Sequence, residues 1–192
     1  MPNIKPEVEA FARIKVVGVG GSGGNTVNHM IRAKVQGVDF IAINTDAQDL
    51  HHNLAPKKIH IGKNLTRGLG AGMNPDLGRQ AAEETIEEIK DALKGADMAF
   101  IVCGFGGGTG TGSGPVIAEA ARSQGALTVA VVTRPFSFEG AQRARIAEEG
   151  LQQLKGSVDA MVLIPNDRLL SVIEKGTTFK DAFAVCDEVV RQ

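Results

Sequence analysis

Apolar and polar residues follow two patterns along this chain, short apolar runs and longer amphipathic stretches. The short runs are rich in β-branched residues and lack an alternating polar face, which is typical of buried strands. They predict strands at 14–20, 38–44, 98–104, 126–133 and 158–165, with a weaker, alternating strand at 57–62. Between them lie predicted helices at 25–33, 46–52, 115–124, 144–154, 167–172 and 179–191.

One further predicted helix is longer than the others. It begins at Pro75, a residue that suits the first helical position. Ala82, Ile86, Ile89 and Leu93 then recur at spacings of four, three and four residues. This spacing places the four side chains on one face, so we expect one continuous helix with that face in the core.

The order of these elements predicts an α/β fold. Strands that are apolar on both faces and separated by helices form a parallel sheet covered on both sides. Right-handed crossovers favour a doubly wound, Rossmann-like order, in which ligands bind at the carboxyl ends of the strands. Phe179, Phe183, Cys186 and Val190 keep helical spacing towards the last residue. We therefore expect one domain that ends within a helix.

Glycine is concentrated in two places. It accounts for 24 of the 192 residues; residues 18–24 hold five of these glycines and residues 104–114 hold seven. The rest of the chain has an ordinary glycine content. Both segments follow predicted strands, so both are expected at the same edge of the sheet.

Charge and cysteine content exclude several function classes. The formal net charge is −1 and aromatic residues are few, so no nucleic-acid surface is expected. Cys103 and Cys186 lie in apolar stretches without disulfide or metal-ligand spacing, which fits a reducing, cytoplasmic compartment. The first ten residues are polar and no apolar run reaches membrane-spanning length, so neither a signal peptide nor direct membrane insertion is expected.

The first glycine segment contains G-x-G-x-x-G as Gly18, Gly20 and Gly23, between a predicted strand and helix. Glycines permit close backbone approach, and a helix N-terminus offers N–H groups and a positive dipole to phosphate. The motif also suits an NAD(P)-binding oxidoreductase domain, since Asp39 lies 21 residues beyond Gly18. That alternative leaves the second glycine segment without a role.

Two other nucleotide and hydrolase motifs are disfavoured. Gly20, Ser22 and Gly24 satisfy G-x-S-x-G, the nucleophile elbow of hydrolases, but that triad needs a later histidine. All four histidines lie in the first third of the chain. No G-x-x-x-x-G-K-S/T occurs, which excludes a P-loop NTPase.

The second glycine segment, GFGGGTGTGSGP (104–115), is the more specific of the two. We interpret it as a concave array of N–H groups around an anion, with the Thr109 and Thr111 hydroxyls as further donors. A packing role is disfavoured because each free backbone residue is entropically costly to order. Two such loops on neighbouring strands suit a nucleoside di- or triphosphate.

The segment GGGTGTG (106–112) resembles the signature of the tubulin/FtsZ superfamily, and its surroundings are closer to the FtsZ branch than to tubulin. These surroundings are GVGGSGGN (18–25), FIAINTDAQ (40–48), LTRGLGAGMNP (65–75), VVTRPFSFEG (131–140) and IPNDRL (164–169). The resemblance implies an N-terminal extension at 1–13, a GTP-binding domain at 14–178 and the start of a central helix at 179–192. It also implies an intact protein that polymerises head to tail and hydrolyses GTP at each subunit interface. Such a protein forms the cell-division ring with membrane-tethering and regulatory partners.

By the same resemblance, three loops hold the nucleotide phosphates. The residues are Gly20, Gly21, Gly107, Gly108, Thr109 and Gly110, with Ala71, Gly72 and Met73 near the terminal phosphate. Glu139 and Arg143 reach the ribose and phosphates, and Asn25, Asn166, Phe183 and Asp187 surround the guanine. The expected binding set is completed by Ser22, Gly23, Gly24, Gly104, Gly106, Thr133 and Pro135. Mg²⁺ is expected with GTP or GDP, held mainly by phosphates and water, and no metal-binding residue is assigned.

The chemistry of Asp187 supports guanine independently. A carboxylate can accept from both the ring N–H and the exocyclic amine of guanine, whereas adenine offers no such pair. Phe183 adds a stacking face. Apart from the glycine loops, however, Phe183 and Asp187 are equally well explained as adjacent turns of an amphipathic helix.

The chain departs from the family's pattern in two ways. Ser22 and Cys103 stand where smaller residues are usual, and both are expected to fit. The family also continues beyond the central helix to a loop with N-x-D-x-x-D acids and a second domain. Asn44, Asp46 and Asp49 match that pattern literally but follow the second strand, so they are not this loop. We therefore expect no catalytic residue in this chain, and binding of GTP or GDP without efficient hydrolysis. A non-catalytic assembly factor of the same fold is the alternative.

Overall fold

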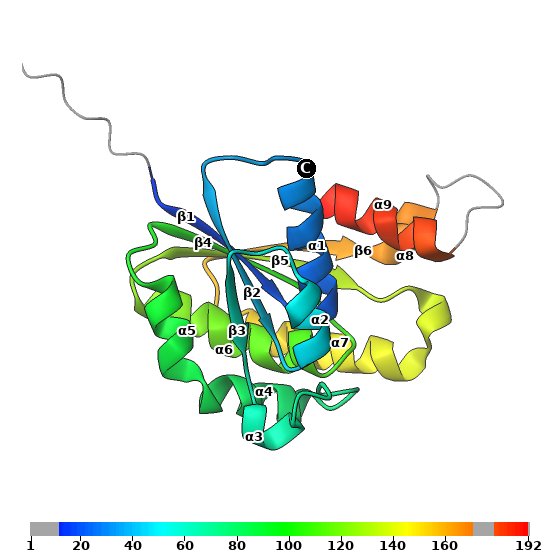
Figure 1. Cartoon of the computed structure of the whole chain (residues 1–192). Helices are drawn as coiled ribbons and strands as arrows, with labels where there is room; N and C mark the ends of the chain where they lie inside the picture. Colours follow the sequence, from blue (N-terminus) through cyan, green and yellow to red (C-terminus); the bar gives the residue numbers. More distant parts are fainter. Residues whose placement is uncertain (1–11, 171–178, 192) are drawn as a thin grey trace, which may run out of the picture.

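A six-stranded parallel sheet forms the centre of the molecule (Figure 1). The structure is a computed structural model that describes residues 12–170 and 179–191. The strands are β1 (Ile14–Val19), β2 (Val38–Asn44), β3 (Lys57–His60), β4 (Met98–Gly104), β5 (Leu127–Arg134) and β6 (Ala160–Pro165). They are arranged in the order β3-β2-β1-β4-β5-β6, which confirms the predicted doubly wound sheet. Because β1 and β4 are neighbours, the two glycine segments that follow them lie side by side.

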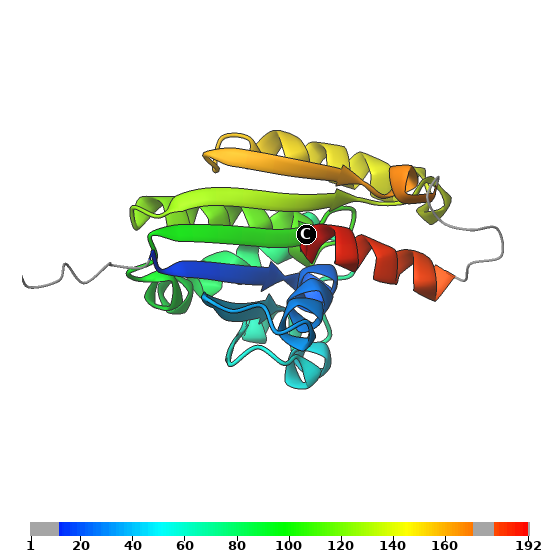
Figure 2. The same ribbon diagram turned by 90° about the horizontal axis from the view of Figure 1, so that it is seen from above.

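Helices cover both faces of this sheet. They are α1 (Gly20–Arg32), α2 (Ala47–His52), α3 (Lys63–Thr66), α4 (Pro75–Glu84), α5 (Ile86–Leu93), α6 (Thr109–Ser123), α7 (Ala141–Leu154), α8 (Asn166–Leu170) and α9 (Phe179–Arg191), with a short 3-10 turn η1 (Ser137–Glu139). Helices α1 and α9 lie beside each other on one face, and α4 to α7 lie on the other (Figures 1 and 2). Of the predicted helix at 167–172, residues 171 and 172 lie outside the described residues, as do residues 1–11 of the predicted extension.

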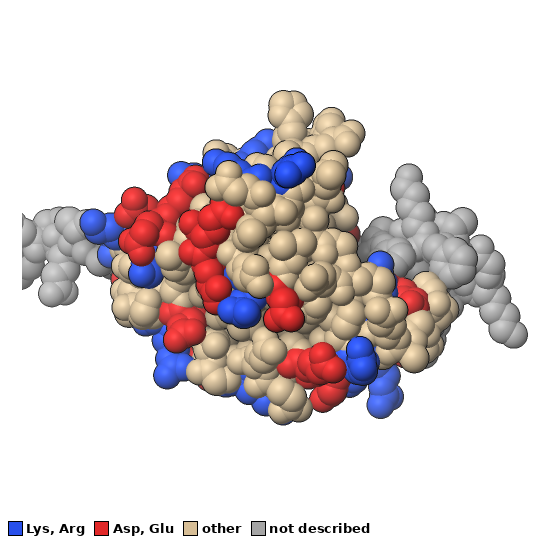
Figure 3. All heavy atoms as spheres, turned by 90° about the horizontal axis from the view of Figure 1, so that it is seen from below, with Lys and Arg blue, Asp and Glu red and all other residues tan. Residues whose placement is uncertain are grey.

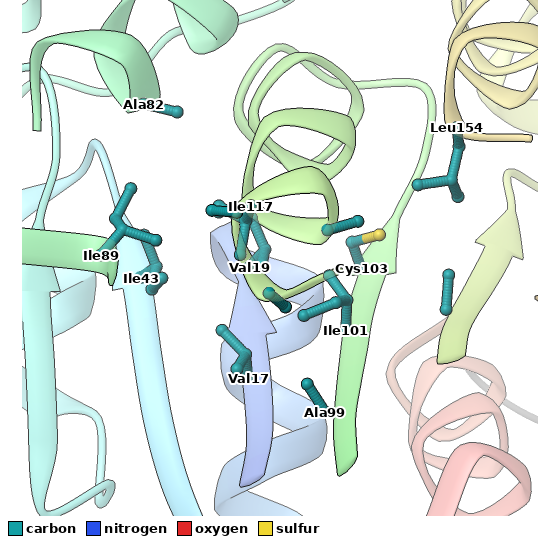
Figure 4. Close-up of a cluster of buried hydrophobic side chains, with 14 of the residues drawn as sticks. Val17, Val19, Ile43, Ala82, Ile89, Ala99, Ile101, Cys103, Ile117 and Leu154 are labelled. Carbon is teal, nitrogen blue, oxygen red and sulfur yellow. The ribbon is translucent and has the colours of Figure 1, made fainter. Parts of the chain in front are cut away.

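The core has a layer on each side of the sheet. On the side of α4 to α7, Ile89, Ile117 and Leu154 pack against strand residues such as Val17 and Ile101 (Figure 4). On the other side, a second cluster joins Val27 of α1 to Val16 and Phe40 of the sheet, and Val190 of α9 packs against it. Burial on both faces is what the uninterrupted apolar runs of the strands predicted.

The helix predicted from Pro75 to Leu93 is two helices. Helix α4 ends at Glu84 and α5 begins at Ile86, with Thr85 between them at φ −112° and ψ 18°. The Thr85 hydroxyl donates to the Ala81 carbonyl oxygen at 3.3 Å. Such bonding of a threonine hydroxyl to the preceding turn weakens helices slightly, and here it accompanies the break. The apolar spacing continues across it, so Ile86, Ile89 and Leu93 still face the core side.

The helix predicted from Pro115 begins six residues earlier, at Thr109, and Pro115 lies inside it. Half of the second glycine segment is therefore helical. A Cβ at Gly110 would lie 2.5 Å from the Gly104 carbonyl oxygen, and one at Gly112 would overlap the Pro75 carbonyl oxygen. The expectation that these glycines have no packing role was thus wrong for Gly110 and Gly112. They allow α6 to approach β4 and α4 closely.

The surface of the described residues carries mixed charge. On the face formed by α4 to α7, acidic side chains gather towards one side, with lysine and arginine among them (Figure 3). Some form ion pairs within one helix, such as Arg79 with Glu83 and Lys90 with Glu87. None of the described helices has the length and apolar character needed to span a membrane.

Candidate functional site

A pocket of about 420 Å³ lies at the carboxyl ends of the central strands. This is the position at which ligands bind in doubly wound sheets. It is lined by Val19, Gly20, Gly21, Ser22, Asn25, Gly72, Gly104, Phe105, Gly107, Gly108, Thr109, Gly110, Thr133, Pro135, Glu139, Arg143, Asn166, Cys186 and Asp187. These residues come from loops and helix ends that are distant in sequence.

The two glycine segments meet on one side of the pocket. Gly20 has φ +70°, and a Cβ at this position would lie 3.2 Å from the Gly110 backbone nitrogen. Glycine at position 20 therefore permits both the left-handed backbone and the close approach of the second segment. Helix α1 begins at Gly20 and α6 at Thr109, so the N-termini of two long helices reach the same pocket wall. Their free N–H groups and dipoles favour an anion there.

Threonine hydroxyls hold the second segment in shape. The hydroxyl of Thr109 is 2.6 Å from the hydroxyl of Thr45, which follows β2. The hydroxyl oxygen of Thr111 accepts from the Gly106 N–H at 2.9 Å, and Thr111 is 1% exposed. Thr111 therefore braces the loop and does not line the pocket, contrary to its predicted role as a donor to the anion.

A third loop closes against the second segment. The Gly108 N–H donates to the Gly72 carbonyl oxygen at 2.7 Å. A Cβ at Gly108 would lie 2.7 Å from the Ala71 carbonyl oxygen, so glycine is needed for this contact. Gly72 lines the pocket, while Met73 is 38% exposed and does not.

At another part of the pocket wall lie Asn166 and Asp187. Asn166 is 5% exposed, and its Oδ1 is buried without a hydrogen-bond partner. Such an acceptor is expected to receive an N–H or O–H from a ligand. The Asp187 Oδ1 accepts from the Thr26 hydroxyl at 3.0 Å. Burial raises the pKa of Asp187, while the Thr26 hydrogen bond and the charge of His29 lower it, and burial is the largest influence.

Glu139 and Arg143 form an ion pair at the pocket wall. The Arg143 Nη1 donates to Glu139 Oε2 at 3.1 Å, and Glu139 Oε1 accepts from the Phe136 N–H at 2.9 Å. The Glu139 side chain is only 15% exposed, against 43% for Arg143. The carboxylate is thus fixed, and the guanidinium remains accessible to an anionic ligand.

Sixteen of the predicted binding residues line the pocket together. Gly23 and Gly24 are placed elsewhere: Gly23 packs against Val102 of β4, and the Gly24 carbonyl accepts from Asn53. Ala71, Met73 and Gly106 are also absent from the lining. Phe183 lies in α9, and its side chain is outside the described residues.

Three lining residues were not predicted, Val19, Phe105 and Cys186. Each is an apolar neighbour of a predicted residue, and their apolar character indicated only a place in the core. Ser22 fits as expected, because Gly104 leaves room for it. A Cβ at Gly104 would lie 2.6 Å from Ser22 Oγ.

The arrangement can bind a ligand with an anionic part and a hydrogen-bonding part. The glycine segments and two helix N-termini line the pocket where the first would lie, and Asn166 and Asp187 line it where the second would lie. Among the described residues, no group of three or more histidine, cysteine or acidic side chains could hold a metal ion.

Solved structures of other proteins share this fold. An empty FtsZ dimer from M. jannaschii is 53% identical to this chain, with a TM-score of 0.90; the match covers 94% of this chain and 52% of that one. GDP-bound CetZ1 from Haloferax volcanii is 25% identical, with a TM-score of 0.84, covering 93% of this chain and 58% of that one. A GTPγS-bound protofilament of CetZ2 from Haloferax volcanii is 26% identical, with a TM-score of 0.84, covering 93% and 56%. The chain thus spans little more than half the length of these structures.

The family comparison agrees with the resemblance in the glycine segments. The model of the GTPase domain of the Tubulin/FtsZ family matches residues 13–174, which include every described strand and both glycine segments. The chain therefore belongs to the Tubulin/FtsZ family, and what it matches is the family's GTPase domain.

Proposed function

We propose that this chain binds GTP and GDP in the pocket between its glycine segments. The observation that carries the proposal is that Asp187 and Asn166 line the same pocket, and that Asn166 Oδ1 has no hydrogen-bond partner. The N-termini of α1 and α6 reach this pocket as well. A carboxylate accepts from the two adjacent N–H donors of guanine, and Asn166 offers a further acceptor. GDP in CetZ1 and GTPγS in CetZ2, both of the same fold, support this choice of ligand.

The phosphates are proposed to lie at the glycine segments, within reach of Arg143. Backbone N–H groups and this guanidinium supply the positive charge, since neither glycine segment contains a lysine. Mg²⁺ supplies further charge compensation when it is bound. We propose that this ion is held mainly by phosphate oxygens and water, as is usual for Mg²⁺ at nucleotide sites.

We propose further that the intact protein is a cytoskeletal GTPase of cell division in the cytoplasm. It self-associates head to tail through the nucleotide face and works with membrane-tethering and regulatory proteins. The empty FtsZ dimer and the CetZ2 protofilament support self-association. In such an assembly, hydrolysis is a matter of positioning water at the terminal phosphate.

The 192-residue chain by itself is proposed to bind nucleotide without efficient hydrolysis. The side chains of its N-x-D-x-x-D segment, Asn44, Asp46 and Asp49, form hydrogen bonds within the protein. Asn44 donates to Asp49 at 2.7 Å, and Asp46 accepts from two N–H groups at the start of α2. A water-orienting carboxylate from a neighbouring subunit, as the family resemblance implies, is therefore required.

Titration calorimetry with GDP, GTP, ADP and NADH tests the proposal. We expect GDP and GTP to bind at least about 100-fold more tightly than ADP, because a site built to hydrogen-bond one base rejects another. NADH is expected not to compete with GDP. Equal affinity for ADP, or displacement of GDP by NADH, would overturn the assignment. Turnover of GTP by the isolated chain at the rate of an assembled FtsZ would contradict the hydrolysis proposal alone.

A further inference from the structure

Helix α1 presents two polar side chains to α9 that the nucleotide pocket does not use directly. Thr26 and His29 lie one turn apart on α1, and α1 and α9 pack side by side (Figure 2). The Thr26 hydroxyl donates to Asp187 Oδ1 at 3.0 Å, and His29 Nε2 lies 2.7 Å from Glu188 Oε2. Two neighbouring carboxylates of α9 are thus each held from α1.

The contact of Thr26 with Asp187 is buried and directional. Thr26 is 2% exposed, and its hydroxyl also lies 3.2 Å from the Ser22 carbonyl oxygen. A hydroxyl that donates to a carboxylate limits the orientations of that carboxylate and favours its ionised form. Since Asp187 lines the pocket and Thr26 does not, the hydrogen bond acts on the ligand only through Asp187.

His29 acts on the same carboxylate from the next turn. Its charge lowers the pKa of Asp187, against the larger effect of burial. Its ring nitrogen also holds Glu188, which Arg191 contacts from within α9. Further along α9, Val190 packs against the apolar cluster that contains Val27 of α1. These contacts determine where α9 lies against α1, and therefore where Asp187 lies in the pocket wall.

We propose that Thr26 and His29 are positioning residues for guanine recognition, which hold the Asp187 carboxylate in place to receive the base. The inference rests on the proposed function, because it assigns a role at the same site. It goes beyond that function in placing part of the specificity on α1, outside the pocket. The phosphate side of the pocket is formed by other residues, so loss of these contacts is expected to affect recognition of the base selectively.

The test compares the affinities of GDP and IDP for the 192-residue chain by calorimetry. IDP carries hypoxanthine, which lacks the exocyclic amine and so offers Asp187 one donor instead of two. Thr26→Val preserves the shape of the side chain and removes the hydroxyl, whereas Thr26→Ser retains the hydroxyl. His29→Gln keeps a nitrogen donor towards Glu188, and His29→Leu removes it. His52→Leu is the matched control, because the His52 ring lies 2.7 Å from the Gln48 carbonyl oxygen and contacts the His51 ring, and none of these residues lines the pocket.

We expect Thr26→Val to weaken GDP binding about tenfold, the scale of one hydrogen bond to a charged group, with about twofold or less change for IDP. Thr26→Ser is expected to restore the preference for GDP. His29→Leu is expected to lose part of the preference, about threefold, because its contact is more exposed, and His29→Gln to retain it. His52→Leu is expected to bind both nucleotides as the unmodified chain does.

Two results would overturn the inference. One is an unchanged ratio of GDP to IDP affinity in both Thr26→Val and His29→Leu. The other is an equal loss for GDP and IDP, which would indicate a structural effect on the whole pocket. If Thr26→Val fails to fold, the partly exposed His29 variants decide the matter by the same ratio. Equal binding of GDP and IDP by the unmodified chain would instead overturn the guanine assignment itself.

Discussion

Under the proposed function, the Asp187 carboxylate binds the base of the ligand, and its burial lowers the stability of the free protein when it is ionised. Burial raises the pKa of this carboxyl group, so the folded state binds its proton more tightly than the unfolded chain does. The stability that the group contributes is therefore largest at low pH, and it is lost as the pH rises from the unfolded pKa through the folded one. Above the folded pKa the buried carboxylate is ionised at the expense of stability, as is common at functional sites.

The first prediction concerns Asp187→Asn. The amide removes the buried charge and retains an oxygen that can accept from Thr26. We expect an unchanged or higher melting temperature of the nucleotide-free chain, together with loss of the preference for GDP over ADP. Calorimetric titration and thermal unfolding of the same samples measure both effects. A variant that keeps its preference for GDP would remove Asp187 from the site.

The second prediction concerns the pH dependence of GDP binding. Only the ionised carboxylate can accept from both donors of guanine, and its pKa lies above that of an ordinary aspartate. GDP affinity is therefore expected to fall, on acidification from neutral pH, at a higher pH than an ordinary aspartate would give. Asp187→Asn should show no such fall in the same window. Superimposable pH profiles for the two proteins would argue against an ionised Asp187 at the base.

Single residues also show how far the sequence could predict the site. Most residues of the glycine segments could be assigned to the pocket from the sequence. Closely spaced glycines directly after a strand indicate a loop whose backbone can approach an anionic ligand. Cys186 was missed because an apolar residue next to Asp187 gives no signal that distinguishes a pocket wall from a core. Thr111 was misjudged because a hydroxyl serves a loop as readily as a ligand, and only the observed hydrogen bond to Gly106 distinguishes the two roles.

At the scale of elements, the contact of α4 with α6 depends on glycine. A Cβ at Gly112 would overlap the carbonyl oxygen of Pro75, at the start of α4. Gly114 is two residues away in the same helix, and a Cβ there would lie 3.4 Å from Cys103 Sγ, an ordinary contact. The two positions thus form a matched pair.

The third prediction uses this pair. Gly112→Ala is expected to destabilise the fold by about 1–3 kcal/mol, the usual effect of overpacking, because α4 and α6 must separate. Gly114→Ala is expected to leave stability unchanged or raise it by up to about 1 kcal/mol, since alanine is the better helix former. Urea unfolding measures both free energies. Equal destabilisation by the two substitutions would show that close packing is not what requires glycine at 112.

Elements were predicted well where a long pattern carried the information and poorly at their boundaries. The strands and the order of the sheet followed from apolar runs and right-handed crossovers. The break at Thr85 was missed because the apolar spacing runs through it, and the hydrogen bond from Thr85 to Ala81 that accompanies it leaves no pattern in the sequence. The early start of α6 was missed because glycines disfavour helix in isolation, and contacts with β4 and α4 override that tendency here.

At the scale of the whole molecule, the loop before α4 carries both an exposed apolar side chain and a residue that lines the pocket. Leu69 lies in the loop before α4 and is 85% exposed, while Gly72 of the same loop lines the pocket. A single exposed leucine is common on protein surfaces, so Leu69 is of interest here because of its place in this loop. Under the proposed head-to-tail assembly, this loop belongs to the face that receives the next subunit.

The fourth prediction follows from that geometry. The 192-residue chain, added to assembling M. jannaschii FtsZ, is expected to reduce filament growth at substoichiometric amounts. It offers the proposed nucleotide face to a filament end, and its match covers only 52% of the FtsZ chain, whose remaining part is proposed to carry the surface that continues the filament. Leu69→Asp in the added chain should weaken this inhibition, because burial of an unpaired charge is costly. GDP affinity should stay unchanged, since Leu69 does not line the pocket.

Light scattering and sedimentation report assembly. Undiminished growth with the unmodified chain would contradict association through this face, and equal inhibition by Leu69→Asp would exclude Leu69 from it.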